Sequence, residues 1–257
     1  MRKTLGLFLL MSLFTFRLQA QEKVNIEATP LWTEEFNQGM EALKNRWDLV
    51  EGHNYSNNRY ADHKASEKKN RFYLTLVKVY DPSKQSINLC LNKLHGLKYG
   101  KIVVRAKCPT AKGIWPAIWL RPTRGLKRTV SGEVDLMEWI SCFKKDQFQA
   151  NFHLWGNFNG KQNNHTQYPK KTTFSCDVSK WHVYSAEWDA SKLIVRVDDK
   201  IVGTWYAKDY PVWPFDYTYE LVLDVAYGDW GASCGFDTKK LPQTMQVDWV
   251  KYYQLKK

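Results

Sequence analysis

The chain of 257 residues lacks several patterns that mark common classes of protein. It has no internal repeat, no low-complexity linker and no long helical pattern, which argues against solenoids, linked domains and helical bundles. A Gly-x-Ser-x-Gly elbow is also missing, which excludes the usual serine-hydrolase arrangement. Beyond the first twenty residues, no apolar run is long enough to cross a membrane, so we expect no membrane span.

Residues 1–20 form a candidate secretory signal peptide. Two basic residues precede an apolar run over residues 5–16, and Ala20 stands just before a polar segment. This run is too short for a membrane span and is typical of a cleaved leader. We therefore expect an exported protein, periplasmic or extracellular, in which residues 21–257 form a single domain and a monomer.

The five cysteines have no metal-ligand spacing, and their odd number leaves at least one thiol unpaired within one chain. We expect one disulfide after export rather than a disulfide framework among Cys90, Cys108, Cys142, Cys176 and Cys234.

The mature chain is basic. Removal of the leader takes away three basic and no acidic residues, so the formal net charge falls from +12 to +9. Such a surplus can attract an anionic partner. Anionic polysaccharide is one candidate, and a lysine-rich solvated surface is the simpler explanation. Nucleic acid is not an expected partner, because export separates the chain from it.

Short alternating runs separated by turn residues predict an all-β sandwich. The segment 31–36 is expected to open the mature fold beside the last strand. The other strands are expected near residues 102–106, 183–188, 193–197, 201–205, 221–226 and 245–253, with tight turns at 189–192 and 198–200.

Three carboxylates stand close together in an otherwise apolar, strand-like run, Gly132 to Trp139. Unpaired buried carboxylates are costly, so stability alone does not explain them. Strand alternation puts Glu133 and Asp135 on one face, but it would turn Glu138 into the core. A bulge at Leu136-Met137 would insert one extra residue and return Glu138 to the side of Glu133. The sequence therefore predicts an irregular strand.

Two glutamates with different pKa values on a concave sheet can cleave a glycosidic bond. Glu133 would be the ionised nucleophile. Glu138 would be the proton donor, kept protonated by its neighbour's charge, and then the base that activates water. Asp135 would orient Glu133 and help to balance the protons. The alternative, a solvated acidic edge strand, is disfavoured by the apolar flanking residues.

Aromatic residues are abundant, with twelve tryptophans and fourteen tyrosines. Aromatic rings fill sandwich cores and also stack on the apolar faces of sugars. Five tryptophans lie near the acidic strand or beside Gly, Pro or Asn in expected loops, and these are candidates for sugar binding: Trp115, Trp119, Trp139, Trp155 and Trp230.

The run Glu-Val-Asp-Leu-Met-Glu resembles the signature of glycoside hydrolase family 16, in the form with two residues between Asp and the second Glu. Further similar segments lie at 113–120, 181–188, 228–231 and 242–253, so the resemblance extends from about Trp32 to Tyr253. It implies a concanavalin-like β-jelly-roll sandwich with a concave, open substrate cleft. It also implies the same roles for the three carboxylates.

The resemblance carries weaker expectations for other residues. It places His153 next to the catalytic carboxylates, where its ring could hydrogen-bond Asp135 and tune proton exchange. Asn58 and Arg59 resemble residues of an early strand that contacts sugars. The chemistry requires no metal or other cofactor, but many members hold a structural calcium away from the cleft, and Asp248 could be a ligand.

The substrate is less narrowly defined. The bulged signature occurs in laminarinase-like β-glucanases, in agarases, porphyranases and carrageenases, and in enzymes that cut galactosyl bonds of host glycans. The segment 228–231 favours the laminarinase-like group. Asp224 and Tyr227 depart from its usual pattern. A polar group suited to an axial hydroxyl or an N-acetyl group favours galactose-containing glycans: Asn159, Asn163, Asn164 and His165.

Four basic residues precede the acidic strand and would favour a sulfated or sialylated substrate if they faced the cleft: Arg121, Arg124, Lys127 and Arg128. The first hypothesis is a retaining endo-β-glycosidase that cuts internal β-1,3 or β-1,4 linkages. A lectin-like sandwich and a transglycosylase are the alternatives. The complete set of carboxylates disfavours the lectin.

Overall fold

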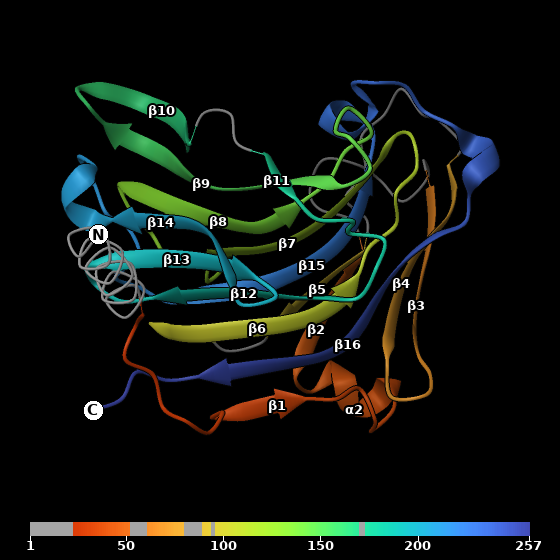
Figure 1. Cartoon of the computed structure of the whole chain (residues 1–257), viewed down its shortest axis with the longest axis horizontal. Coiled ribbons are helices and arrows are strands. Elements are labelled where there is room, and N and C mark those ends of the chain that lie inside the picture. The colour runs from red at the N-terminus through yellow and green to blue at the C-terminus, as the bar shows by residue number, and fades with distance from the viewer. Residues whose placement is uncertain (1–22, 52–60, 80–88, 94–95, 170–172) are drawn as a thin grey trace, which may run out of the picture.

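Two antiparallel β-sheets packed face to face make up the protein (Figure 1). The computed structural model describes residues 23–51, 61–79, 89–93, 96–169 and 173–257. The expected leader, as well as Asn58 and Arg59, lies outside the described residues. The two-sheet arrangement confirms the all-β sandwich that the strand patterns predict.

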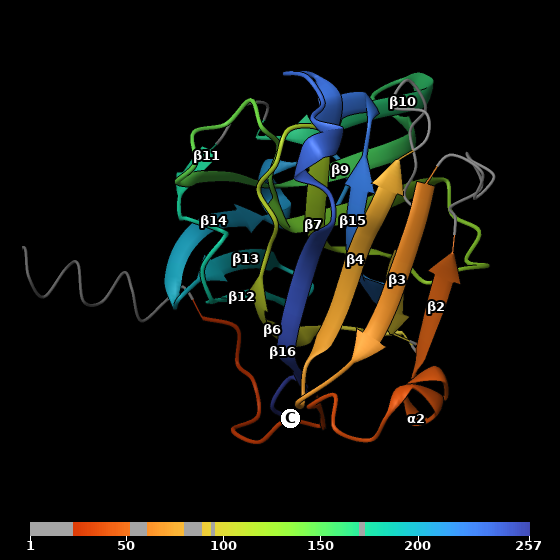
Figure 2. The ribbon, with the colours of Figure 1, turned by 90° about the vertical axis from the view of Figure 1, so that its right-hand side faces the viewer.

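The first sheet has the strand order β14-β13-β12-β6-β16-β4-β3, with β1 paired to β16. Figure 2 shows β16, β4 and β3 side by side, as this order requires. Its strands are β1 (Trp32–Glu34), β3 (Ala61–Glu67), β4 (Phe72–Val79), β6 (Gly100–Lys107), β12 (His182–Trp188), β13 (Lys192–Val197), β14 (Lys200–Tyr206) and β16 (Gln243–Tyr253).

The second sheet has the order β10-β9-β8-β7-β15-β5-β2, with β11 paired to β9. Its strands are β2 (Trp47–Glu51), β5 (Leu89–Lys93), β7 (Ile114–Pro122), β8 (Val130–Glu138), β9 (Gln147–Phe158), β10 (Lys161–Tyr168), β11 (Thr173–Ser175) and β15 (Tyr219–Tyr227). The helical elements are short: α2 (Met40–Lys44), η2 (Ala207–Asp209), η3 (Asp229–Ala232) and η4 (Thr238–Lys240). No helix in the described ranges has the length and apolarity needed to span a bilayer.

The core lies between the two sheets. Each strand contributes every second side chain, the ones that point inward, to this core. In β6, for example, Ile102, Val104 and Ala106 are fully buried, whereas Lys101 and Arg105 are not. All six strands expected over 102–253 are present, and β1 pairs with β16 as expected for the opening segment. These strands were predictable because one face of each is buried, which leaves a period of two in the sequence.

Strand β10 is not predicted by its sequence. Asn163, Asn164 and His165 of this segment are expected only to supply hydrogen-bonding groups, yet the segment from Lys161 to Tyr168 pairs with β9. Its residues are exposed or half-buried, so no apolar alternation marks it. Trp139 is a second correction: it was expected to favour sugar binding, but only 5% of it is exposed and it belongs to the core.

The second sheet is the concave one. In Figure 1 the ribbons of β8 and β9 are visibly curved along their length. Strands β7, β8, β9 and β15 lie in the middle of this sheet, and β8 and β15 carry the acidic residues. A disulfide joins Cys142, after β8, to Cys234, after η3, while Cys108 and Cys176 are free thiols. One disulfide is what the cysteine count predicts.

Candidate active site

A β-bulge in β8 brings the three carboxylates to one face, as the sequence predicts. Against β7, Met137 pairs with Ile118 and Asp135 with Trp119, which leaves Leu136 without a partner. Against β9, the register shifts between Asp135 and Glu138. An extra residue of this kind reverses the alternation beyond it. Leu136 and Met137 are therefore both fully buried in the core.

A cavity of about 380 Å³ lies over this strand. It receives side chains from β7, β8, β9 and β15. Its described lining consists of Trp115, Ala117, Trp119, Glu133, Asp135, Glu138, Trp155 and Asp224. Aromatic rings and carboxyl groups in one hollow are suited to binding a sugar ring and acting on its glycosidic oxygen.

Glu138 is held by three neutral donors. Its Oε1 accepts from Trp115 Nε1 at 3.1 Å, and its Oε2 accepts from Asn151 Nδ2 at 3.3 Å and Gln149 Nε2 at 3.5 Å. Only 7% of Glu138 is exposed. Neutral donors fix the direction of the carboxyl group without adding a positive charge that would force it to ionise.

Asp135 lies between the two glutamates and contacts a histidine. His153 Nε2 lies 3.1 Å from Asp135 Oδ2, a buried oxygen that has no hydrogen-bond partner among the described residues as they stand, so His153 is the nearest group that could donate to it. In the β8–β9 register His153 stands opposite Glu133. His153 therefore lies beside the carboxylates, where the resemblance places it.

The carboxyl groups of the cavity share strongly raised pKa values. Burial raises the pKa of Glu133 to about 8 and that of Glu138 to about 8, and in both cases the charge of Asp135 adds to the effect. Burial also raises the pKa of Asp135 well above its ordinary range, with a further contribution from Asp224. These groups cannot all be ionised at neutral pH, so the cluster retains protons.

Burial raises the pKa of both glutamates, so the pKa shifts do not by themselves separate the nucleophile from the proton donor. Both are removed from water and both face Asp135, so burial rather than a neighbour's charge is the larger cause. They differ instead in their contacts. Glu138 is fixed by neutral donors, whereas Glu133 is half-buried and open to the cavity.

Asp224 adds a fourth carboxyl group to the cavity. It lies on β15, opposite Ala117 of β7, and only 3% of it is exposed. Its Oδ1 accepts from Trp119 Nε1 at 2.8 Å. Burial raises its pKa to about 7, and the charge of Glu133 also raises it. Trp119 thus lines the cavity, and its indole N–H also orients the carboxyl group of Asp224.

The remaining aromatic candidates lie at the two ends of the site. Trp155 lines the cavity and is 41% exposed. Trp230 lies on η3 and packs edge-on against Trp115 with ring centroids 5.1 Å apart. It does not belong to the described lining, so its position supports Trp115 rather than a sugar directly. The Cys142–Cys234 disulfide ties the η3 loop to the end of β8.

The arginines before β8 are paired with carboxylates. Arg121 binds Glu220 at 3.1 Å, and Arg124 contacts both Asp48 and Glu220. Arg128 binds Asp216 at 3.1 Å. None of these arginines, nor Lys127, is in the described lining of the cavity. An anionic substrate thus remains a prediction without support from these side chains.

Asp248, the candidate calcium ligand, lies on β16 in the other sheet. Its carboxylate accepts from Arg71 at 3.0 Å and from Arg105, and both guanidinium groups lie over the Trp181 ring. Two guanidinium groups already balance this carboxylate, and the calcium site stays a prediction.

Glu133, Asp135 and His153 bring potential ligand atoms within 4.8 Å of one another, a spacing that could also hold a cation. Two of these three groups, Asp135 and His153, are already in contact with each other.

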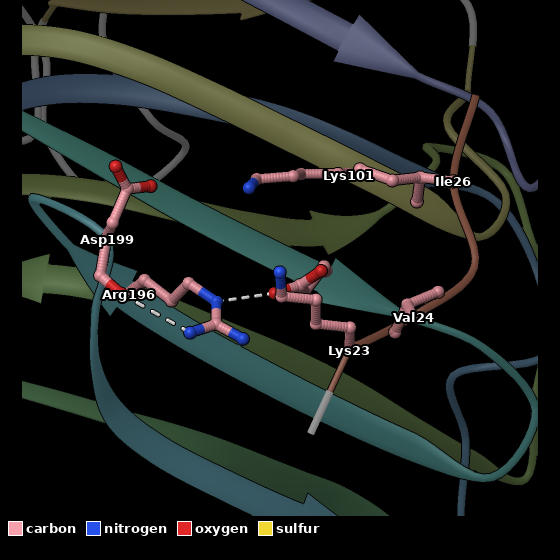
Figure 3. Close-up of a pocket in the computed structure, with 7 residues that line it drawn as sticks. Lys23, Val24, Ile26, Lys101, Arg196 and Asp199 are labelled. Atoms are coloured by element: carbon pink, nitrogen blue, oxygen red, sulfur yellow. Dashed lines mark hydrogen bonds and ion pairs between the residues drawn. The ribbon is translucent and has the colours of Figure 1, made fainter. Parts of the chain in front are cut away.

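A second cavity, of about 370 Å³, lies against the first sheet and the N-terminal segment. Figure 3 shows Lys23, Val24 and Ile26 on one side and Arg196 and Asp199 on the other. Arg196 Nε donates to Glu187 at 2.5 Å, so these two charged residues of the cavity lining neutralise each other. Its described lining has no aromatic ring on which a sugar could stack.

The structure adds site residues that were not assigned from the sequence. Gln149 and Asn151 share the cavity face of β9 with His153 and Trp155, while Phe148, Ala150, Phe152 and Leu154 are buried on the other face. This polar and aromatic alternation in 147–155 is the signal that could have found them. The contact of His165 with His153 had no such signal, because β10 itself was not predicted.

Comparison with known proteins decides the family. The model of glycosyl hydrolases family 16 matches residues 52–251. The chain belongs to glycosyl hydrolase family 16. Membership in this family makes it a glycoside hydrolase by descent, and its two sheets form the β-jelly roll that the resemblance implies.

Three relatives of this family 16 chain show the range of the likeness. A beta-glucanase from Rhodothermus marinus is 26% identical over 87% of this chain and 84% of its own length. A keratan-sulfate endo-1,4-beta-galactosidase from Sphingobacterium multivorum is 30% identical over 62% of this chain but only 37% of its own. The structure of an endo-acting O-glycanase from the human gut microbiota has a TM-score of 0.71 at 25% identity, covering 89% of this chain and 91% of its own.

Proposed function

We propose that this family 16 chain is a retaining endo-β-glycosidase that cuts internal linkages of a polysaccharide or glycan by double displacement. The observation that carries the proposal is the β8 bulge, which aims Glu133, Asp135 and Glu138 into one aromatic-lined cavity. Retaining enzymes need two carboxyl groups on one cleft, one as nucleophile and one as acid and base.

In the first step, the Glu133 carboxylate attacks the anomeric carbon and forms a glycosyl ester. The bond from this carbon to the leaving oxygen breaks, and Glu138 gives its proton to that oxygen. The raised pKa of Glu138, about 8, keeps this proton available at neutral pH. The buried carboxyl groups share a proton. When the sugar binds, Asp135 can take this proton from Glu133, which leaves Glu133 ionised for the attack.

In the second step, the Glu138 carboxylate takes a proton from water. The resulting oxygen attacks the anomeric carbon and releases Glu133 with net retention of configuration. Trp115, Asn151 and Gln149 hold Glu138 in place by donating hydrogen bonds to its two carboxyl oxygens.

A β-1,3-glucan such as laminarin is the substrate class that we place first. The beta-glucanase from Rhodothermus marinus supports a β-glucan, because the likeness spans most of both chains. Galactose-containing glycans are the second class. The acidic Asp224 in the cavity and the polar β10 hairpin favour them, as do the names of the galactosidase and O-glycanase relatives.

Oligosaccharide release from a polysaccharide panel tests the function. The panel contains laminarin, mixed-linkage glucan, agarose, porphyran, carrageenan, keratan sulfate and mucin glycans. We expect internal cleavage of one class, with the β-anomer as the first product by NMR. An α-anomer as first product would contradict the retaining mechanism. Products longer than the substrate, formed when acceptor sugars are added, would identify a transglycosylase.

The residue roles are tested by Glu133→Gln and Glu138→Gln. Each change keeps the shape of the side chain and removes the acid chemistry, so hydrolysis should fall by at least about 100-fold. Glu41→Gln is the control, because Glu41 is an exposed carboxylate on α2, paired only with Lys44 in the described structure. Binding without hydrolysis in the wild type would instead favour the lectin-like alternative. Export is tested by the N-terminal sequence of the secreted protein, which we expect to begin at Gln21.

A further inference from the structure

Three aromatic rings from the β9–β10 hairpin stack beside the carboxylates. His165 lies directly opposite Trp155 in the register, and their ring centroids are 3.6 Å apart with planes 9° from parallel. The His153 ring is nearly parallel to both of these rings, and its centroid lies 5.1 Å from that of His165 and 5.8 Å from that of Trp155. These contacts hold the two histidine rings edge to edge, with His153 Nδ1 2.8 Å from His165 Nε2.

The distances define a chain of groups that leads from the rim to the catalytic strand. His165 Nε2 meets His153 Nδ1, and His153 Nε2 meets Asp135 Oδ2 at 3.1 Å. A neutral imidazole has one N–H donor and one acceptor nitrogen. When Asp135 is ionised, its oxygen requires the proton of His153 on Nε2. His153 Nδ1 is then an acceptor, and His165 must present its own Nε2–H to it.

We propose that His165 is a positioning residue for the family 16 reaction, which fixes the tautomer of His153 so that an N–H faces Asp135. This inference rests on the proposed function, in which Asp135 exchanges protons with the two catalytic glutamates. With His165 in place, the N–H of His153 offsets part of the cost of ionising the buried Asp135, while Glu138 keeps its proton.

The surroundings of His165 favour this role over a purely structural one. His165 is exposed on β10, an edge strand that pairs only with β9 in the described structure, so it contributes little to the core. The titratable group that faces it is His153. Beyond His153 lie Asp135, then Glu133 and Glu138 on β8 and Asp224 on β15. A group at this place can alter proton exchange without touching the sugar.

Two substitutions separate the N–H donor from the stacked ring. His165→Phe keeps a flat ring against Trp155 and removes the donor. His165→Gln restores an amide N–H close to the former position of Nε2. Gln162→Ala, an exposed change on the same strand, is the control. The readouts are kcat, KM, the pH profile of kcat/KM, and the ring ¹⁵N shifts of His153 in protein labelled on histidine.

We expect His165→Phe to lower kcat about 10-fold with KM changed less than about 2-fold, a smaller loss than that of a group that transfers the proton itself. Loss of charge on Asp135 should lower the pKa of Glu138 and move the alkaline limb to lower pH. His153 should change from the Nε2–H form to a mixture of tautomers. His165→Gln should restore most of the activity and the Nε2–H form.

An unchanged His153 tautomer and pH profile in His165→Phe would overturn the inference, as would a change in KM alone. The ¹⁵N measurement needs no substrate, so it reports on His165 even if the panel finds no hydrolysis. Failure of the proposed function and failure of this inference are therefore distinguishable.

Discussion

At the scale of single residues, each carboxyl group has its own set of partners. Glu138 faces the Trp115 indole and two amides, Asp135 faces His153, and Asp224 faces the Trp119 indole. The aromatic residues of this cleft thus have two roles: the ring surfaces line the cavity, and the indole N–H groups hold acids in place. An indole donates but cannot accept, so it favours the ionised form of the acid that it holds.

Trp115→Phe should separate these two roles. The ring surface is retained, and the hydrogen bond that lowers the pKa of Glu138 is lost. The pKa of Glu138 should rise, so the alkaline limb of the kcat/KM profile should move to higher pH, opposite to the shift expected for His165→Phe. The same change at Trp249, on β16 beside Lys251, serves as the control. A profile that moves to lower pH would contradict the assigned hydrogen bond.

At the scale of elements, the β8 bulge and the β9 alternation build the site together. The bulge could be predicted because three carboxylates and an apolar run cannot satisfy strict alternation otherwise. The strands around it could be predicted because each has a buried face. Strand β10 could not, since neither of its faces is buried and its stability comes from pairing with β9. The contact between His153 and His165 depends on that pairing and was therefore missed.

The pKa shifts of the glutamates could not be predicted from the sequence alone. The pattern predicts which acids meet, but the depth of the cavity determines how far water is removed from each of them. Burial raises the pKa of both Glu133 and Glu138, because both side chains line the same tryptophan-lined hollow.

The Cys142–Cys234 disulfide links two elements at one end of the cleft across 92 residues of sequence. Replacing both cysteines with serine should destabilise the fold by about 4 kcal/mol, because the unfolded chain regains the freedom of a large loop. The η3 loop carries Trp230, which packs on Trp115, so KM should rise as well. Thermal unfolding checks the first effect. Reductant should lower the Tm of the wild type and leave the double variant unchanged.

At the scale of the whole molecule, the acidic cavity makes stability depend on pH. Glu133 and Glu138 have pKa values of about 8 in the folded chain, above the ordinary value of 4.5. The folded state therefore binds these protons more tightly than the unfolded state does. The stabilisation is complete below about pH 4.5 and is lost as the pH rises toward 8.

Glu138→Gln should therefore raise the Tm relative to wild type, and by more at pH 8 than at pH 5. Glutamine has the same size and never ionises, so it avoids the cost of a buried charge. Glu41→Gln, on the exposed helix α2, should give no such difference between the two pH values. An equal change in Tm at both pH values would show that the folded-state pKa of Glu138 is close to ordinary.

The order of strands in the second sheet, β15, β7, β8, β9 and β10, has a consequence for how specificity can change. A polymer lying across these strands would meet Asp224, then the indoles of β7, then the acids, then Trp155. Each successive sugar unit would thus be read by a different strand. The outermost ribbon, β9–β10, ends at a free margin of the sheet, so grafting it from one relative to another should alter chain-length or sugar preference while the bond-breaking strand stays untouched.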